Sequence, residues 1–147
     1  MGKKTRSLIV IGLLIAGIAV MAYPAFSSYI NAIHSSRAVQ ALSAQVEGTG
    51  SAALEEQRRL AAAYNDAVST GAVPGDYGEI LDFGNGIMGS LRIPRIDVEL
   101  PIYHGVSDAV LQKGVGHMPR SAFPIGGAGN HSVLTGHTGL PSARLLT

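Results

Sequence analysis

The sequence predicts an N-terminal transmembrane helix and a second helical segment, followed by a mainly β region. Three observations carry this prediction: an uncharged apolar run over residues 7–26, apolar side chains at helical spacing over 31–70, and a strict alternation of apolar and polar residues after residue 94. At 147 residues, the chain has room for one ordinary domain beyond its anchor.

Composition excludes several classes of function. The sequence contains no cysteine, so disulfides, cysteine-ligated metal sites and a thiol nucleophile are absent from these 147 residues. Three of the eleven basic residues are Lys3, Lys4 and Arg6, and eight basic residues face ten acidic ones over the rest of the chain. No basic stripe therefore remains for a nucleic-acid partner.

Residues 7–26 are predicted to form a transmembrane anchor, because twenty residues at helical rise span about 30 Å, the thickness of the hydrocarbon core. Residues 1–6 are the basic start, and their charge predicts a cytoplasmic N-terminus. Tyr23, Phe26 and Tyr29 are expected at the outer interface, where aromatic rings are favoured. The predicted localisation is thus the cell membrane, crossed once, with the β region outside the cytoplasm.

The alternative for the same run is a cleaved signal peptide, since Val20 and Ala22 satisfy a small-residue cleavage pattern. An uncleaved anchor is favoured, because the apolar run exceeds a usual signal-peptide core and Pro24 follows the candidate cut closely. In either case, the chain after about residue 30 lies outside the cytoplasm.

Residues 27–70 are expected to be an extracytoplasmic helical segment, with Val39, Leu42 and Val46 on one face. The glycines within 47–51 predict a break between two helices. Six glycines in 71–89 predict a long loop over 71–88, which is a candidate lid or a plain linker.

The β region is assigned to residues 89–147. Residues 91–93 form a short strand, and a second strand over 95–103 places Ile96, Val98, Leu100 and Ile102 on one face. Pro101 cannot donate to a ladder, which predicts an edge or a bend. Residues 107–114 are expected to form one helical turn capped by Ser107, and 131–136 a last short strand.

The candidate chemistry lies in the histidines, four of which fall in the β region: His104, His117, His131 and His137. His131 and His137 have no carboxylate between them and fit no familiar ligand spacing, so no metal or other cofactor is predicted. A Ser132–His137 hydrolase stays open, because a triad requires spatial convergence that spacing cannot establish. Local sequence alone also allows His137 to be a loop histidine without a catalytic role.

A longer stretch resembles a known family. The motifs "IPRI", "LPIYHG", "GVGHMP", "PIGGAGNHSVLTGH" and "GLPSARLL" occur in this order within residues 88–146. The ordered set resembles the front half of a sortase catalytic domain, most closely in the class C, pilus-assembling branch. The resemblance implies that residues 89–147 form the N-terminal part of a sortase-like β-barrel, so that the fold is a partial barrel behind an anchored helix.

The resemblance also implies an activity. His137 matches the catalytic histidine, whereas the family's cysteine and arginine lie further along the chain, and Arg144 does not match that arginine. A sortase is a cysteine transpeptidase: its thiolate attacks the carbonyl of an LPXTG-type sorting motif, and an acceptor amine takes the acyl group. Implied partners are sorting-motif-bearing surface or pilin proteins, an acceptor amine from a pilin lysine or a cell-wall peptide, and the membrane.

Three expectations qualify this interpretation. Class C lids commonly carry an Asp-Pro-aromatic motif, but Asp76-Tyr77 and Asp82-Phe83 lack the proline, so a lid of the usual form is not expected. Thr138 stands where many relatives have arginine. Without a cysteine, the chain is expected to be a sortase fragment, inactive as given. The alternative is a membrane-tethered extracytoplasmic module that binds peptide without catalysis.

Overall fold

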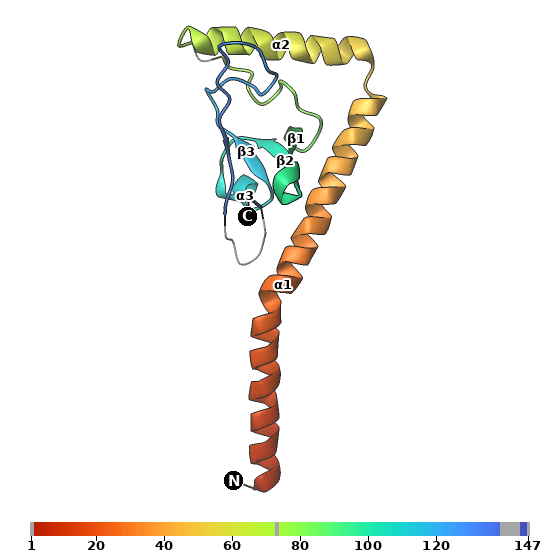
Figure 1. The fold of residues 1–147 in the computed structure, drawn as a ribbon, viewed down its shortest axis with the longest axis vertical. Helices are drawn as coiled ribbons and strands as arrows, with labels where there is room; N and C mark the ends of the chain where they lie inside the picture. The colour runs from red at the N-terminus through yellow and green to blue at the C-terminus, as the bar shows by residue number, and fades with distance from the viewer. Residues whose placement is uncertain (1, 73, 139–144, 147) are drawn as a thin grey trace.

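The computed structural model describes residues 2–72, 74–138 and 145–146. Helix α1 (Lys3–Gly48) runs without a break from the basic start into the body of the protein. Figure 1 shows that its axis bends part-way along. Pro24 lies inside the helix, where its missing N–H and its ring oppose the regular hydrogen-bond ladder, which is the ordinary cause of such a bend.

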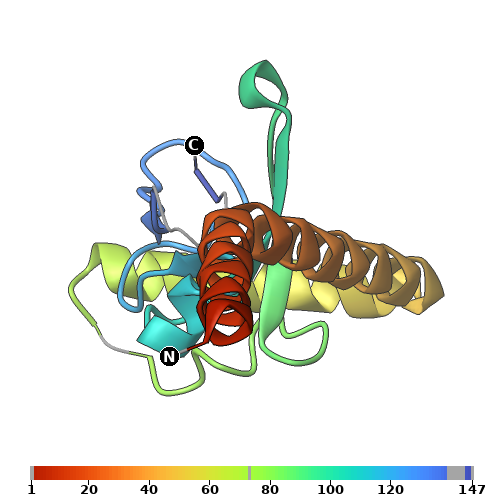
Figure 2. The same cartoon turned by 90° about the horizontal axis from the view of Figure 1, so that it is seen from below.

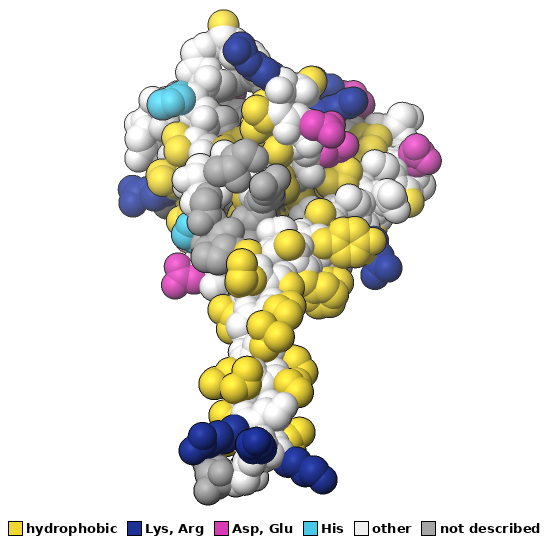
Figure 3. All heavy atoms as spheres, turned by 60° about the horizontal axis from the view of Figure 1, so that its bottom comes forward, with side chains coloured by type: hydrophobic (Ala, Val, Ile, Leu, Met, Phe, Trp, Pro, Cys, Tyr) yellow, Lys and Arg dark blue, Asp and Glu magenta, His cyan; other side chains and the backbone are white. Residues whose placement is uncertain are grey.

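The first part of α1 is long and apolar enough to cross a membrane, by length and composition. Apolar side chains surround this part of the helix and basic side chains gather at its free end (Figure 3). The aromatic residues expected at the outer interface, Tyr23, Phe26 and Tyr29, are all exposed on the helix surface.

The predicted break between two helices is confirmed. Helix α1 ends at Gly48, Thr49 is its extended C-cap, and α2 (Ser51–Ser69) begins after Gly50, which is also extended. Helix α2 then lies across one end of the sheet, whereas the second half of α1 runs along the side of it (Figure 1). The two helices therefore hold the β region from two directions.

The β region forms one four-stranded mixed sheet in the order β1-β2-β3-β4. Its strands are β1 (Ile87–Ile93), β2 (Val98–His104), β3 (Val115–His117) and β4 (Leu134–Thr135). The β2–β3 pair is parallel and the other two pairs are antiparallel. The predicted barrel is thus an open sheet within the described residues, with β1 and β4 at its edges.

The prediction that a strand begins at Arg95 is wrong. Residues Pro94–Ile96 form a 3-10 turn, η1, and Asp97 adopts a left-handed conformation with φ 50°, so β2 begins only at Val98. Ile96 is consequently 46% exposed rather than on the buried face. The expected strand over 91–93 is longer than predicted and joins β2 through η1 in a hairpin that extends beyond the rest of the sheet (Figure 2).

Pro101 is not on an edge strand, because β2 pairs with both β1 and β3. The β1 ladder includes Pro101 opposite Ser90, but the β3 ladder begins only one residue later, at Ile102. Pro101 is therefore paired on one side only, which is how an interior strand tolerates a residue without an N–H.

Strand β3 was not predicted, because three residues are too few to establish a period. The helical turn α3 (Asp108–Leu111) is confirmed, with Ser107 as its N-cap. The Ser107 carbonyl accepts hydrogen bonds from the N–H groups of Val110 and Leu111, while the Ser107 side chain makes no capping hydrogen bond. The last strand is confirmed but is shorter than predicted.

The core is centred on Phe123, which is fully buried. Its ring centroid lies 4.7 Å from that of Tyr64 in α2, 5.2 Å from His117 in β3 and 5.6 Å from Tyr77 in the preceding loop. Aromatic rings at such separations are stabilised beyond their area burial. Helix α2, the loop before β1 and the sheet are thereby joined in one core.

Asn65 fastens α2 to the segment that carries Phe123. Its Oδ1 accepts the Phe123 N–H at 2.6 Å, and its Nδ2 donates to the Phe123 carbonyl at 3.2 Å. Asn65→Ala would leave buried backbone groups unsatisfied, so we expect it to lower the free energy of unfolding by about 1–3 kcal/mol. Denaturant unfolding of the full chain in detergent measures this. Gln112→Ala, at an exposed position, is the control and should change stability by less than about 0.5 kcal/mol.

Candidate active site at His137

His137 lies two residues beyond β4, at a defined end of the sheet. In the β3–β4 ladder, Gly116 pairs with Thr135 and His117 with Leu134, so the same register carried onward places His137 opposite Gly114. This is the end where β3 begins. His104 and His117 are paired at the other end of β2 and β3.

The imidazole of His137 is half-buried and makes no hydrogen bond to any described residue. Its backbone carbonyl accepts the Leu146 N–H at 3.4 Å, which ties the end of the described chain to the residue after Gly136. A Cβ at Gly136 would lie 3.0 Å from Leu146 Cδ1 and 3.7 Å from Val115 Cγ2. The backbone beside His137 is thus closely packed, whereas its ring nitrogens have no hydrogen-bond partner among the described residues.

The Ser132–His137 alternative is not supported by the structure. Ser132 Oγ is buried and makes no hydrogen bond to any described residue. The two residues flank β4, and no hydrogen bond joins Ser132 Oγ to the His137 ring. No group of three or more metal-ligating side chains occurs among the described residues either.

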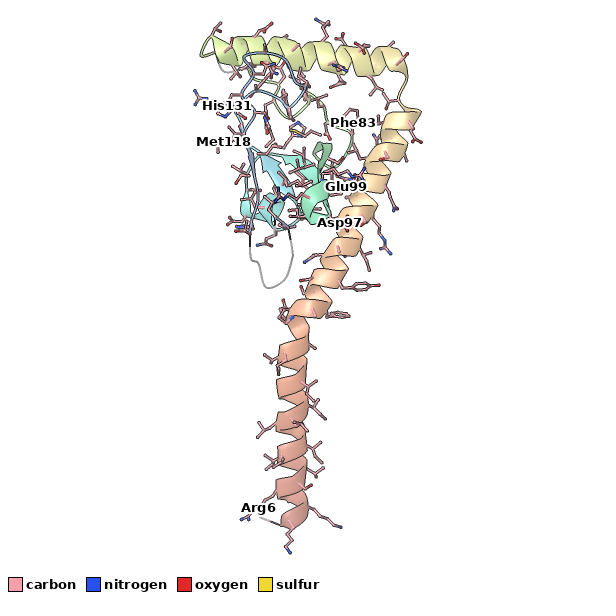
Figure 4. All side chains as sticks on the ribbon, viewed as in Figure 1. Arg6, Phe83, Asp97, Glu99, Met118 and His131 are labelled. Carbon is pink, nitrogen blue, oxygen red and sulfur yellow. The ribbon has the colours of Figure 1, made fainter. Side chains whose placement is uncertain are left out.

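His131 lies at the opposite end of β4 from His137. Its side chain is exposed, and its carbonyl accepts the Ala122 N–H at 3.1 Å. It lines a cavity of about 470 Å³ between the end of α2 and the segment joining β3 to β4. Figure 4 shows His131 beside Met118, on the side of the sheet away from α1.

His117 is a buried structural histidine, which local sequence did not reveal. Its Nε2 lies 2.9 Å from the Ala122 carbonyl, and its Nδ1 lies 3.1 Å from the Tyr77 hydroxyl. The same hydroxyl donates to the His117 carbonyl at 2.8 Å and accepts the Gly105 N–H at 2.9 Å. Such a network of buried polar groups fixes the core and leaves no free nitrogen for catalysis.

Burial lowers the pKa of His117, against a smaller opposing effect of its hydrogen bond to the Ala122 carbonyl. The neutral imidazole is therefore favoured in the folded chain. As the pH falls below about 6.5, the unfolded chain binds a proton that the folded chain resists, so the free energy of unfolding decreases. Above that pH, His117 contributes no pH dependence.

We expect the denaturant midpoint of the full chain to drop between pH 7.5 and pH 5.5, and His117→Gln to reduce this dependence. His131→Gln removes an exposed histidine and should leave the pH dependence as in the unmodified chain. Equal pH slopes for the unmodified chain and His117→Gln would contradict the assignment.

The loop before β1 packs at the end of the sheet opposite His137. Tyr77 contacts His117 and Gly105, and His104 approaches two carbonyls of this loop and its exit, Ile80 at 2.8 Å and Gly86 at 3.1 Å. No hydrogen bond or aromatic contact joins the described part of this loop to His137. The interpretation of 71–88 as a candidate lid therefore stays a prediction.

The His137 end of the sheet is also the end nearest the apolar part of α1. Lys113, adjacent to Gly114, shares a pocket with Asn31 and His34. Further along the helix, Gln45 contacts Gly84, next to the opposite end of the sheet. The helix thus runs past the sheet from its His137 end to its His117 end.

Comparison with known proteins identifies the β region. Residues 91–145 match the family model of the sortase domain. This part of the chain is similar to the sortase domain. Structural comparison agrees, and it extends the similarity to the sortase C type that the sequence motifs indicated. Among curated proteins, no match to the chain is found.

Three solved sortases illustrate the similarity. Sortase C1 from Streptococcus agalactiae is 36% identical, with a TM-score of 0.68 over 74% of this chain and 61% of that one. Streptococcus pneumoniae sortase C, described with its pilin substrate specificity, is 34% identical, with a TM-score of 0.66 over 74% and 59%. A lid mutant of the S. agalactiae enzyme is 34% identical, with a TM-score of 0.66 over 73% and 59%. The chain thus spans about 60% of the length of these sortases.

Proposed function

We propose that this chain is the membrane-anchored N-terminal part of a class C-like sortase, a cysteine transpeptidase that joins surface or pilin proteins to an amine. The observation that carries the proposal is His137. It occupies the position that the family resemblance assigns to the catalytic histidine, and its ring has no hydrogen-bond partner among the described residues. Its half-exposed ring suits a group that must exchange protons with a substrate.

In the proposed reaction, His137 acts with a cysteine thiolate outside these 147 residues. The thiolate attacks the carbonyl carbon of the sorting motif, the peptide bond breaks, and the imidazolium of His137 gives its proton to the leaving amine. An acceptor amine then attacks the thioester, passes its proton to His137, and releases the thiolate. An arginine, also outside these residues, stabilises the charge that develops on the carbonyl oxygen.

The open sheet supports the partial-barrel proposal. Strands β1 and β4 are its edges among the described residues, and exposed strand edges are templates for further pairing. Additional strands carrying the cysteine and arginine would pair with these edges and close the barrel. The shared region covers 61% and 59% of two similar sortases, so those chains are long enough to supply further strands.

The proposed substrates are proteins with an LPXTG-type sorting motif, including pilins, and the acceptor is a pilin lysine or a cell-wall peptide amine. The support is the sortase family match together with the similarity to a sortase described with pilin specificity. The test is to extend the reading frame beyond Thr147 and assay transfer of a sorting-motif peptide to an amine. Activity should require a downstream cysteine and arginine, and the 147-residue chain should show none.

The alternative function is a membrane-tethered module that binds peptide without catalysis. It is supported if the extended protein binds the peptide but neither cleaves nor transfers it. Binding and turnover are measured separately, so the two functions are distinguished by one set of samples.

The anchor is proposed to cross the membrane once, with residues 1–6 in the cytoplasm and the β region outside. The support is the basic cluster of Lys3, Lys4 and Arg6 before the apolar part of α1. We expect a protease added outside intact cells to digest the chain after about residue 30 and to spare an N-terminal tag. Protection of the β region in intact cells, with digestion after lysis, would reverse the proposed orientation.

A further inference from the structure

A small pocket lies where α1 passes the His137 end of the sheet. Its volume is about 350 Å³, and it is lined by Asn31, His34 and Ser35 of α1, Tyr103 of β2, and Lys113 between α3 and β3. All five side chains carry a hydrogen-bonding group. The pocket joins parts of the sequence that are about 70 residues apart or more, so no sequence motif reveals it.

The pocket lies directly beyond the apolar part of α1. The predicted span ends at Phe26, and Asn31 follows it by five residues, a helical rise of about 7.5 Å at most along the membrane normal. The headgroup layer adds about 5–7 Å on each side of the hydrocarbon core. Asn31 thus lies no further out than the outer boundary of the headgroup layer, and Tyr103 and Lys113 line the same pocket from the side of the sheet.

The charges in this pocket favour an anion. Among the described residues, the Lys113 ammonium makes no ion pair. The rings of His34 and Tyr103 supply further donors. Carboxylates occur in the neighbouring pocket of about 220 Å³, which shares Asn31 and Ser35 but includes Asp97 and Glu99. Figure 4 shows Asp97 and Glu99 beside α1.

We propose that the pocket around Lys113 binds the phosphate of an anionic membrane lipid. The inference rests on the membrane anchoring put forward under the proposed function. The Lys113 ammonium pairs with the phosphate, while the His34 ring of α1 donates a hydrogen bond from the other wall. Lys113 is adjacent to Gly114, which lies opposite His137 in the continued register. A bound headgroup therefore fixes the His137 end of the sheet against the bilayer surface.

The test uses the full chain in neutral detergent micelles, titrated with dihexanoyl phosphatidylglycerol. The NMR signals of the His34 ring are followed, because they report on this pocket and not on the basic residues at the N-terminus. We expect saturable shifts, and an affinity about fivefold weaker in Lys113→Gln, as one lysine near an anionic surface contributes. Lys113→Arg should restore binding, because it restores the cation.

Two further variants make the test specific. Arg58→Gln removes an exposed cation on α2, away from the pocket, and should leave the affinity unchanged. Glu99→Gln removes a carboxylate from the neighbouring pocket and should tighten binding, because it removes repulsion of the phosphate. A fall in affinity with Glu99→Gln would contradict the proposed polarity of the site.

Inorganic phosphate and dihexanoyl phosphatidylcholine separate the sources of the anion. Both should shift the His34 signals much less than phosphatidylglycerol at equal concentration. Equal binding of inorganic phosphate, or an unchanged affinity in Lys113→Gln, overturns the lipid proposal. Membrane anchoring is tested separately by flotation of the unmodified chain with liposomes, so a chain that floats but has no lipid-dependent shifts disproves only the headgroup site.

Discussion

In an extended protein that supplies the cysteine and the arginine, His137→Ala is expected to lower peptide transfer by about 10²–10⁴-fold or more. General acid–base help is typically of this size, and loss of one member of a Cys–His pair exceeds it when the two act as a unit. The substituted residue makes no side-chain hydrogen bond in the described structure, so stability should change little. Transfer from a sorting-motif peptide to an amine, with a melting temperature for each variant, measures both effects.

His131→Ala is the matched control. It removes the same chemical group from the other end of β4, where the side chain is exposed and lines a different cavity. Turnover should remain near that of the unmodified enzyme. If the His137→Ala variant keeps normal turnover while the His131→Ala variant loses it, the assignment of His137 as the catalytic histidine is wrong.

Phe123→Ala is expected to have the largest effect on stability. The ring is fully buried and contacts Tyr64, Tyr77 and His117, so its loss leaves a cavity at the point where helix, loop and sheet meet. Truncations of this kind cost about 3–5 kcal/mol, a large part of the total stability of an ordinary domain. Denaturant unfolding of the full chain in detergent should show a much lower midpoint or no cooperative transition.

Phe83→Ala is the comparison for that experiment. This phenylalanine packs against the same core but is only partly buried. It should cost clearly less than Phe123→Ala. Equal losses for the two variants would mean that the aromatic cluster is not the centre of the fold.

The helices were predictable because their signals are local. Gly48 and Gly50 weaken the helix interior, and the break falls between them. The start of β2 was not, because apolar alternation through Ile96 continues across a segment that Pro94 and the left-handed Asp97 turn out of the sheet. A period of two reports which faces side chains share only where the backbone is extended.

The site was predictable in part. The glycine-flanked position of His137 after a short strand is local, and the structure retains it at the end of β4. The roles of the other histidines depend on distant partners: His117 on Tyr77, and His104 on the Ile80 and Gly86 carbonyls. Residues so far apart in sequence are brought together by the sheet, and their spacing carries no signal of it.

The unbroken helix α1 makes the direction in which the sheet faces depend on a residue count. Its apolar part and the part packed against β2 belong to one continuous helix. An insertion between 27 and 30 therefore both rotates and raises the sheet relative to the apolar part. One extra residue rotates the sheet by about 100° and raises it by about 1.5 Å, whereas seven raise it by about 10 Å and return it to within about 20° of its original azimuth. A series of such insertions separates the height of His137 above the bilayer from the direction in which His137 faces. The effect of height and the effect of direction on capture of a membrane-bound substrate can then be measured independently.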